Sequence, residues 1–377
     1  MDHKTLKSVL VIGGGFSGMS AAIELRKRGH AVDLVEADAG WRSYGAGISI
    51  GGPTLRAFKT LGILEQYLEI GFAGDGCDLL LPNGQLVGRL ATPRVAGPDV
   101  PGAGAVMRPA LAALLAQATR ESGATVRLGV SFTSLQQHAD GVDVQFSDGS
   151  NGRYDLVIGA DGLYSKTREA LFPEAPQPRY SGQGVWRAVL PRPAEVDRTL
   201  VWVGHKLKLG VNPVSATHMY LFLTEDRVQK EHLPQAEQPA MLRALLAQFP
   251  ATLVQWMSAQ IDDAAQVIYR PLEALLLPRP WYEGRVVLIG DACHATTPHL
   301  ASGACIGIED ALVLAEELEA RATLPAALEA FQARRWERCR MVVENSLRLG
   351  EIEITGGDKE EHANIMRDSL IRLAEPI

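Results

Sequence analysis

Short apolar runs and helical patterns alternate along much of this chain. A continuous apolar run at Ser8–Ile12 is followed by a helical pattern through residues 21–25 and by a second apolar run at residues 31–35. Further apolar runs at residues 155–159 and 286–289 are each followed by residues at helical spacing. Short buried strands that alternate with helices are typical of a parallel sheet covered by helices. The pattern therefore predicts an α/β fold with a Rossmann-like domain.

The pattern changes between about residues 173 and 279, where prolines become frequent. Four apolar runs follow one another here without long helices between them: 185–190, 200–203, 207–211 and 219–223. Such runs favour an antiparallel sheet, which we expect to form an inserted substrate-binding domain. We therefore divide the chain into residues 1–175, the insertion at 176–280, and residues 281–377, which complete the first domain. In this last part we expect a long helix at 324–345 and then a charged tail.

A glycine-rich turn after the first apolar run matches the spacing GxGxxG. The first glycine allows the tight turn, the second lets the backbone approach a pyrophosphate, and the third lets helix and strand pack closely. Glu36 ends the second apolar run 18 positions after the last glycine, where a carboxylate can accept hydrogen bonds from both ribose hydroxyls. These features predict dinucleotide binding by Gly13, Gly15, Phe16, Ser17, Gly18, Glu36 and Ala37.

Two later strands end beside an aspartate and a glycine. Asp161 and Gly162 follow one of them, and Gly290 and Asp291 follow the other. Both aspartates are expected at the carboxyl edge of the sheet, where open α/β proteins bind ligands. Asp161 is also compatible with a solvated turn.

The residues around Asp291 indicate a ligand that carries both hydroxyl groups and a negative charge. An aspartate after a strand can accept hydrogen bonds from a polyol. Small residues at 301–304 then open a helix and leave its first N–H groups free for an anion. Reduced flavin carries a ribityl polyol and a ring that becomes anionic, so it fits this pair of features.

Two other stretches are candidates for ligand contact. Residues 45–53 include four glycines and predict either a strand whose backbone, at Gly47, lies against a flat ligand or an ordinary flexible loop. Arg108 stands just before Pro109 at the start of a predicted helix that runs to about Ser122. Its side chain is therefore expected to point at whatever ligand lies at that helix start.

Length and composition fit a globular protein with a sizeable core. The chain has 377 residues, of which 46% are hydrophobic, and a net charge of −7 from 37 basic and 44 acidic residues. This balance argues against a general nucleic-acid or anionic-membrane binder, and no apolar run is long enough to span a bilayer. The four cysteines show no CxxC or zinc-type spacing. We therefore expect reduced thiols in a cytoplasmic protein and no metal site.

In this order and spacing, three motifs resemble those of the single-component FAD-dependent aromatic hydroxylases, which share the p-hydroxybenzoate hydroxylase fold. The motifs are residues 13–18 with Glu36, Asp161-Gly162 with Ser165 and Arg168, and Gly290-Asp291 with Pro298. The resemblance extends to about residue 345, and residues 290–311 most resemble 6-hydroxynicotinate 3-monooxygenase, urate hydroxylase and salicylate hydroxylase. It implies a GR2-type FAD-binding domain with an inserted antiparallel-sheet substrate domain and C-terminal helices.

The resemblance also implies residue roles and a reaction. Glu36 would bind the adenosine ribose, Arg108 the pyrophosphate or ribityl region, Asp161 FAD and the reductant, and Asp291 the ribityl chain. The backbone of residues 302–304, which includes Gly303 and Ala304, would face the flavin pyrimidine, and Pro298 is a further FAD-binding position. NADH or NADPH would reduce FAD without a nucleotide domain of its own. Reduced FAD and O2 would form a C4a-hydroperoxide that hydroxylates a small aromatic or N-heteroaromatic substrate. We expect a monomer or homodimer.

A phenol or hydroxypyridine reacts better as its anion, so the pocket is expected to hold a base or proton relay. The candidates are His299 beside the flavin loop and Tyr220 and Lys208 on the predicted pocket sheet. Each is also compatible with a structural role, which is packing for His299 and Tyr220 and a solvated face for Lys208. His294 is expected to order its own loop, and Ser49 is a weaker candidate for substrate contact.

Two other functions are compatible with the same motifs. A flavin-dependent epoxidase or reductase of the same fold would share all three, and so would a flavin-binding protein that has lost turnover. Ring-dependent NAD(P)H oxidation with oxygen uptake and a hydroxylated product separates the hydroxylase from both alternatives.

Overall fold

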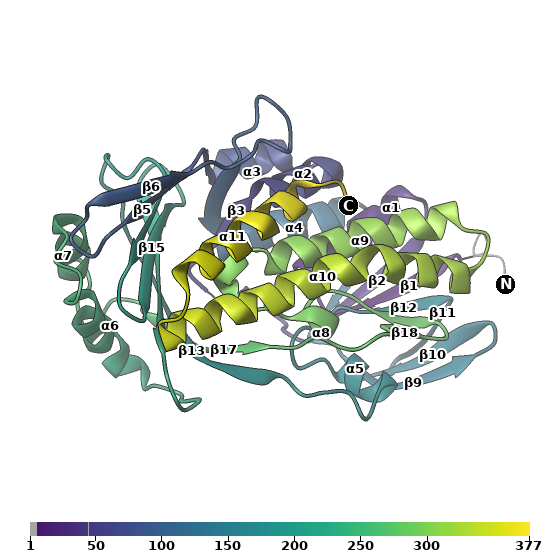
Figure 1. Ribbon diagram of the computed structural model, residues 1–377. Coiled ribbons are helices and arrows are strands. Elements are labelled where there is room, and N and C mark those ends of the chain that lie inside the picture. The colour runs from purple at the N-terminus through teal and green to yellow at the C-terminus, as the bar shows by residue number, and fades with distance from the viewer. Residues whose placement is uncertain (1–5, 44) are drawn as a thin grey trace.

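The structure is a computed structural model that describes residues 6–43 and 45–377. Its centre is a six-stranded sheet in the order β18-β19-β12-β1-β2-β8 (Figure 1). The strands from β19 to β8 pair in parallel, and β18 is antiparallel to β19. The predicted α/β fold with a parallel sheet is confirmed. The strand bounds are β1 (Ser8–Ile12), β2 (Ala31–Glu36), β8 (Thr125–Leu128), β12 (Leu156–Gly159), β18 (Tyr282–Glu283) and β19 (Val286–Leu288).

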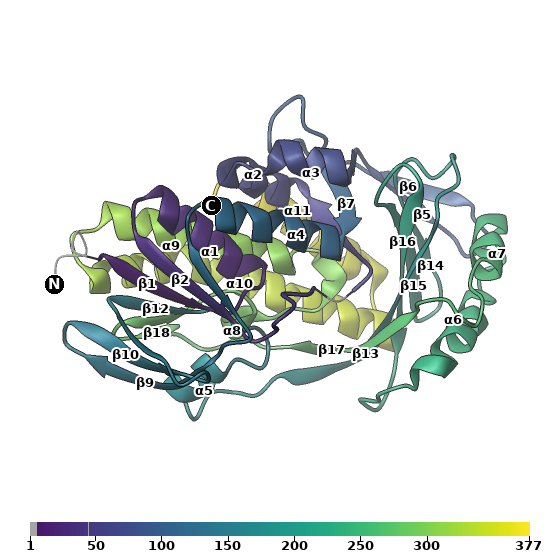
Figure 2. The same cartoon turned by 180° about the vertical axis from the view of Figure 1, so that it is seen from behind.

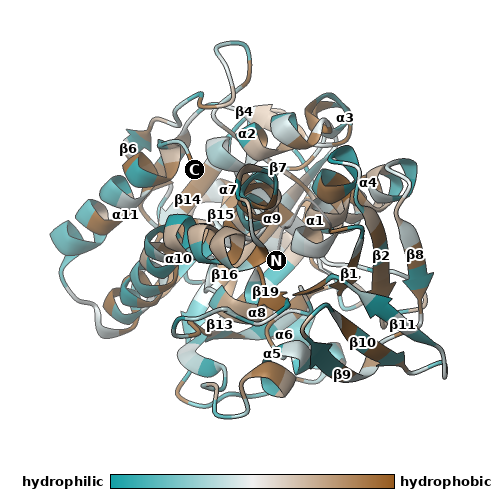
Figure 3. Cartoon of the chain, turned by 90° about the vertical axis from the view of Figure 1, so that its right-hand side faces the viewer, coloured by the Kyte–Doolittle hydropathy of each residue, from teal (hydrophilic) through white to brown (hydrophobic). Residues whose placement is uncertain are grey.

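Both faces of this sheet are covered, which explains why its strands are continuously apolar. Val9 and Val11 of β1 pack in the core formed with the helices α1 (Phe16–Lys27) and α9 (Gly303–Ala320). Leu10 and Ile12 point to the opposite face and pack against a small antiparallel sheet. Figure 2 shows that small sheet beneath the central one, and Figure 3 shows the hydrophobic colour of β1 and β2. Its strands are β9 (Phe132–His138), β10 (Gly141–Phe146) and β11 (Asn151–Tyr154).

The glycine-rich segment at 45–53 contains a strand, β3 (Gly47–Gly51), so the strand interpretation is confirmed over the loop. It pairs with β7 (Ala103–Met107), which also pairs with β4 (Phe72–Gly74). Three helices are next to these strands in the sequence. They are α2 (Gly52–Leu61) and α3 (Leu64–Ile70), between β3 and β4, and α4 (Arg108–Glu121), directly after β7.

The inserted segment forms the predicted sheet, but the sheet is larger than the insertion. It has seven strands in the order β17-β13-β16-β15-β14-β5-β6. Two of them come from residues 77–90, outside the predicted insertion at 176–280, and β5 pairs with β14 in parallel. The boundaries at 176 and 280 therefore describe an insertion in the sequence rather than the whole sheet. The bounds are β5 (Cys77–Leu80), β6 (Leu86–Leu90), β13 (Arg179–Pro191), β14 (Thr199–Val203), β15 (Leu207–Pro213), β16 (His218–Asp226) and β17 (Ile268–Ala274).

The two faces of the seven-stranded sheet differ. One face is covered by α6 (Gln238–Leu246) and α7 (Thr252–Ala259), and Trp202, Leu209 and Leu223 are buried beneath them. The other face turns toward the domain built on the central sheet and borders a cavity described below. This asymmetry follows from the alternation of side chains along each strand.

The C-terminal region forms the helices that the resemblance implied and is more helical than the residue pattern alone predicted. The long helix α10 (Leu324–Thr355) runs ten residues past the predicted end at residue 345, and Gly356, with a φ of 64°, terminates it. The prediction of a charged tail is wrong, because residues 359–374 form α11 (Lys359–Ala374). Arg338 donates a hydrogen bond to the Leu373 carbonyl at 2.7 Å and so holds the end of α11. Among residues 6–43 and 45–377, no helix combines the length and apolar character needed to cross a bilayer.

Candidate active site

A large cavity lies between the carboxyl edge of the parallel sheet and the open face of the seven-stranded sheet. Its volume is 2310 Å³, whereas sites for a single drug-sized molecule span about 300–1,000 Å³. Glu36, Asp161 and Asp291 all line it. Every other predicted site residue lines it as well, apart from Gly18. The three motifs, which are far apart in the sequence, thus meet around one cavity.

Glycine positions explain how closely the three motifs pack. Gly13 has a φ of 105°, and a Cβ there would lie 2.4 Å from the Ala160 carbonyl oxygen. A Cβ on Gly290 would lie 2.3 Å from the Ser17 hydroxyl oxygen. A Cβ on Gly18 would lie 2.0 Å from the Gly13 carbonyl oxygen. Gly18 therefore serves the predicted helix–strand contact and does not border the cavity.

The start of α1 differs from these packed glycines. A Cβ on Gly15 would meet no protein atom within 4 Å, because this residue faces the cavity. Gly15 is the N-cap of α1, and no side chain caps the helix. The N-terminus of α9 is also uncapped, since the Ser302 hydroxyl donates to the Leu300 carbonyl at 2.7 Å. Two helix starts with free N–H groups thus border one cavity and favour anionic groups there.

The two upstream acidic residues are held by hydrogen bonds. Glu36 accepts one from the Gly14 N–H at 2.7 Å, which ties the glycine-rich turn to the end of β2. Asp161 accepts one from the Ser165 hydroxyl at 2.5 Å, at the start of α5 (Lys166–Leu171). Asp161 therefore has a structural partner as well as a place on the cavity wall.

Asp291 and Arg108 place opposite charges on the helix side of the cavity. Asp291 projects into the cavity from α8 (Asp291–His294), and burial raises the pKa of its carboxyl while His294 and Arg108 oppose that shift. The Arg108 guanidinium carbon lies 4.7 Å from the centre of the Phe16 ring, at the glycine-rich turn. A phosphate group at the start of α1 would therefore have a cation beside it.

A buried ion network holds the loop that carries Asp291. Asp310, on α9, accepts hydrogen bonds from Gly290 N–H at 2.8 Å, His294 Nε2 at 2.5 Å and Arg335 Nε at 2.8 Å. Burial would raise the pKa of Asp310, but His294 and Arg335 lower it to about 2. His294 therefore orders its own loop. It also lies with Asp310 near the Cys293 thiol, in a geometry that could hold a metal, but the two already pair beside the Arg335 cation.

The sheet side of the cavity carries the predicted relay residues. Tyr220 lies on β16, Lys208 on β15, and His299 in the turn that precedes α9. The Tyr220 hydroxyl accepts a hydrogen bond from Arg187 Nε at 3.0 Å. A Cβ on Gly47 would lie 2.5 Å from the Tyr220 side chain, so this glycine lets β3 approach the pocket sheet.

Sequence reasoning missed the group that connects two of these residues. Glu353, on α10, accepts a hydrogen bond from Lys208 Nζ at 2.5 Å, and its carboxylate lies 3.3 Å from Nε2 of both His299 and His362. Burial alone would raise the pKa of Glu353, but Lys208 and the two histidines hold it well below its usual value.

His299 has the opposite environment. Burial and the Lys208 charge lower its pKa, so the imidazole is neutral at pH 7. Its Nδ1 hydrogen-bonds the Thr297 hydroxyl at 2.9 Å. Its Nε2 has no hydrogen-bond partner among the described residues, although the Glu353 carboxylate lies nearby. That nitrogen is buried and faces the Glu353 carboxylate, which would stabilise a proton held there.

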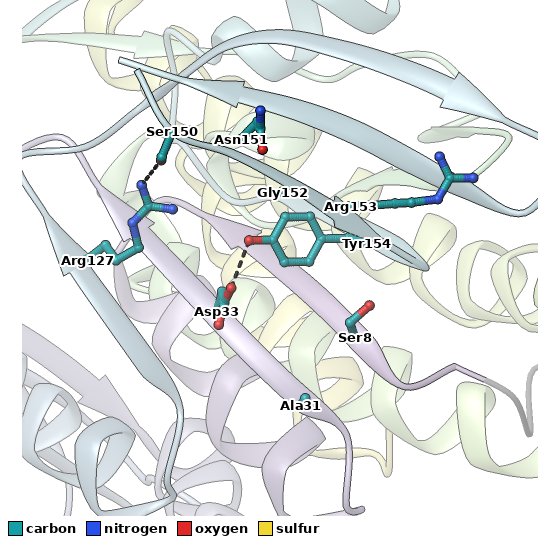
Figure 4. A pocket seen from close by; sticks show the side chains of 9 residues that line it. All are labelled: Ser8, Ala31, Asp33, Arg127, Ser150, Asn151, Gly152, Arg153 and Tyr154. Atoms are coloured by element: carbon teal, nitrogen blue, oxygen red, sulfur yellow. Dashed lines mark hydrogen bonds between the residues drawn. The ribbon is translucent and has the colours of Figure 1, made fainter. Parts of the chain in front are cut away.

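A second hollow lies at the amino ends of the central strands, away from the cavity (Figure 4). The Tyr154 hydroxyl donates to Asp33 at 2.8 Å there, and Arg127 donates to the Ser150 hydroxyl at 2.5 Å. These polar groups satisfy one another, and the hollow shares no predicted site residue with the large cavity.

Comparison with known protein families shows which family this chain belongs to. A family model described as "FAD binding domain" matches residues 7–346. The chain belongs to this FAD-binding family. The predicted family, its fold and the FAD cofactor are confirmed, as is FAD-dependent monooxygenase activity as the class of reaction.

Several members of the family are similar over almost the whole chain. Aurachin C monooxygenase/isomerase of Stigmatella aurantiaca is 32% identical, over 98% of this chain and 95% of that protein. The 2-heptyl-3-hydroxy-4(1H)-quinolone synthase of Pseudomonas aeruginosa is 33% identical, over 97% of this chain and 94% of the synthase. The crystal structure of Klebsiella pneumoniae HpxO with FAD and uric acid superposes with a TM-score of 0.80 and 27% identity, over 98% and 93% of the two chains.

Proposed function

We propose that this FAD-dependent monooxygenase hydroxylates an N-heteroaromatic ring that carries an acidic N–H or O–H group, with NADH or NADPH as the reductant. One observation carries the proposal. A single cavity has two uncapped helix N-termini on one side and the neutral His299, next to Glu353 and Lys208, on the other. Two similar proteins support the ring class, since one is named for a hydroxylated quinolone and the other was solved with uric acid.

The residues on the helix side fit FAD. The open space at Gly15 and the free N–H groups of α1 suit a pyrophosphate, and Arg108 adds a positive charge beside it. Glu36 and Ala37 would hold the adenosine ribose, and Asp291 the ribityl hydroxyls. The remaining proposed contacts are Gly13, Phe16, Ser17, Gly47, Asp161, Pro298, Gly303 and Ala304, all on the cavity wall.

Bound FAD supplies the hydride acceptance and oxygen activation that no side chain can provide. The chain contributes binding, orientation and charge. The N–H groups at the start of α9 stabilise negative charge on the flavin ring. A ring bound against the cavity wall would displace water from the reacting groups.

The sheet side handles the substrate proton. His299 accepts it at Nε2, and the Glu353 carboxylate 3.3 Å away stabilises the imidazolium that results. Before the proton moves, the charges of Lys208 and Glu353 balance each other. Proton transfer then adds one positive charge to His299, which lies beside the negative Glu353 carboxylate. Tyr220, held by Arg187, is placed to orient the ring.

The test measures NAD(P)H oxidation, oxygen uptake and product with urate, 4-quinolones and hydroxypyridines, using FAD-loaded protein and ¹⁸O2. We expect one of these rings to stimulate NAD(P)H oxidation and to gain one labelled oxygen atom. Oxidation that yields only hydrogen peroxide whatever ring is present would assign a reductase. An alkene substrate that yields an oxirane would assign an epoxidase. FAD binding without NAD(P)H consumption with any ring would assign a non-catalytic flavoprotein.

We also propose a cytoplasmic monomer or homodimer without a nucleic-acid or membrane partner. The net charge of −7 supports the absence of polyanionic partners. Light scattering on a sizing column measures the oligomeric state, and an assembly larger than a dimer would contradict the proposal.

A further inference from the structure

The cavity continues beyond the ring site into a region whose walls carry several apolar side chains. Apolar residues from three strands line the cavity there. Val201, Val203 and Leu79 share one face of the sheet, and Val87 lies at the bulge where the register of β5 and β6 shifts. Val201 and Val203 come from β14, Leu79 from β5, and Val87 from β6. The opposite wall is α11, where Met366 lines the same cavity.

The exposure of these side chains is unusual. Ten large apolar side chains are exposed in the described part of the chain, and five of them line this one cavity: Leu81, Val87, Leu90, Val203 and Ile371. Val87 is 56%, Val203 48% and Ile371 58% exposed. Apolar side chains that cluster at one opening, rather than scatter singly, mark a surface that binds something. The opening here is continuous with the proposed ring site.

Basic residues also line this part of the cavity, and three of them pair with acidic neighbours: Arg89, Lys206 and Arg367. Arg89 lies between Val87 and Leu90 on β6, but its guanidinium is turned to Asp78 through two hydrogen bonds of 2.6 and 2.9 Å. Lys206 donates to Asp226 at 3.3 Å, and Arg367 donates to Asp368 at 3.2 Å. The exposed apolar side chains therefore share this part of the cavity with basic groups whose charges are paired.

We propose that these exposed apolar side chains form a tail channel between α11 and the β5–β6–β14 edge, which binds a linear alkyl tail attached to the substrate ring. The inference rests on the proposed function for the ring and adds the second half of the substrate. The volume of 2310 Å³ leaves room for a tail beside a dinucleotide and a ring. Val87 and Ile371 at the rim leave the channel open to solvent, so the end of a long tail can project outward.

The experiment compares tail lengths on one ring. FAD-loaded protein is titrated with 2-methyl-, 2-propyl-, 2-pentyl- and 2-heptyl-4-quinolone, and binding is followed by the flavin absorbance and by calorimetry. Burial of each methylene is expected to tighten binding about three- to fourfold until the tail reaches the rim. A dissociation constant that does not change along the series would overturn the proposal.

Two variants and a matched control locate the effect. Val203→Asp and, separately, Val87→Asp place a charge in the tail channel and are expected to flatten the dependence on tail length. Val228→Asp introduces the same charge at a side chain that is 98% exposed and does not line the cavity. It should leave the dependence intact. An equal effect of all three variants would also overturn the proposal, because the tail would then bind elsewhere.

A ringless series separates this inference from the proposed function. Straight-chain alcohols from 1-pentanol to 1-undecanol carry a tail but no ring, and calorimetry should show tighter binding with length that Val203→Asp removes. If the alcohols behave so while no ring stimulates NAD(P)H oxidation, the channel stands and the proposed function fails. If a ring is hydroxylated while neither series depends on length, the function stands and the channel fails. The protein is also sedimented with phosphatidylcholine vesicles. If wild type sediments with them, Val203→Asp does not, and ligand binding does not depend on tail length, the rim binds lipid and the channel proposal is overturned.

Discussion

Lys208 Nζ and the Glu353 carboxylate lie 2.5 Å apart and join the pocket sheet to the C-terminal helix α10 across the cavity. The side chains are only 19% and 14% exposed, so solvent screens this pair less than a surface ion pair. The same carboxylate lies 3.3 Å from His299 Nε2. One contact therefore sets both the geometry of the pocket wall and the charge beside the proposed base.

Glu353→Gln keeps the size of the side chain and removes its charge. Lys208 then loses its ionic partner, and we expect the free energy of unfolding to fall by about 2 kcal/mol. Glu353 is also one of the groups that raise the pKa of His299, so its loss lowers that pKa further. The acid limb of the pH–rate profile should move to lower pH. Glu344→Gln, on the same helix but paired with Arg340 at the surface, is the control for both measurements. If the acid limb of the pH–rate profile does not move in Glu353→Gln, Glu353 does not take part in the proton transfer.

His299→Gln is expected to retain FAD and lose hydroxylation by about 100-fold or more, as expected for loss of a positioned base. Flavin reduction should continue, and the oxygen consumed should appear as hydrogen peroxide. Product analysis with a peroxide assay measures both. The control is His218→Gln, at an exposed histidine at the start of β16. Undiminished product yield would show that His299 is not the relay.

The same histidine links pH to stability. Burial lowers the pKa of His299 below its ordinary value of 6.5, so the unfolded chain takes up a proton that the folded chain does not. This contribution to stability is fully present above pH 6.5 and is lost as the pH falls from there toward the lower folded-state pKa. Wild type should therefore lose more thermal stability between pH 7.5 and 5.5 than His299→Gln. Calorimetric scans at both pH values measure the difference, and parallel losses in the two proteins would contradict it.

The fold was largely predictable because its strands and turns carry local signals. A strand buried on both faces must be apolar throughout, so β1, β12 and β19 stand out in the sequence. Gly13 and Gly18 are required by close backbone approaches that any side chain would block. Buried strands and close glycine contacts also explain why the three motifs lie around one cavity.

Glu353 could not be predicted in the same way. It stands in a helix rich in Arg and Glu, where a carboxylate has the same local pattern whether it faces solvent or a cavity. Its role depends on contacts with Lys208, 145 positions earlier, and with His362 on α11. The charged tail was mispredicted for a related reason, because α11 is held by packing and by arginines that bind its last carbonyls. Arg187 did carry a local signal, because it is a lone cation in an apolar run. The alternation of side chains along that strand could have placed it on the pocket face of the sheet.

Gly15→Val tests the cofactor cradle. The new side chain would meet no protein atom near its Cβ, so we expect the variant to fold, but it would occupy the space proposed for the pyrophosphate. The purified protein should be colourless, and added FAD should not restore the flavin spectrum. Gly88→Val is a matched control, since its Cβ is equally free and the residue does not line the cavity. A yellow Gly15→Val protein would place the pyrophosphate elsewhere.

Asp310→Asn tests whether the buried network supports the loop of Asp291. Asparagine keeps the shape but leaves the His294 and Arg335 cations without their shared anion. Removal of one partner from a buried ion pair costs about 3–5 kcal/mol, so the urea midpoint should fall accordingly. The Gly290 N–H also loses its carboxylate acceptor, and the affinity for FAD should decrease even where the variant remains folded. Asp263→Asn, at an exposed ion pair with Arg243, should change neither quantity. A destabilised variant that binds FAD as tightly as the wild type would show that the network supports the core but does not position Asp291.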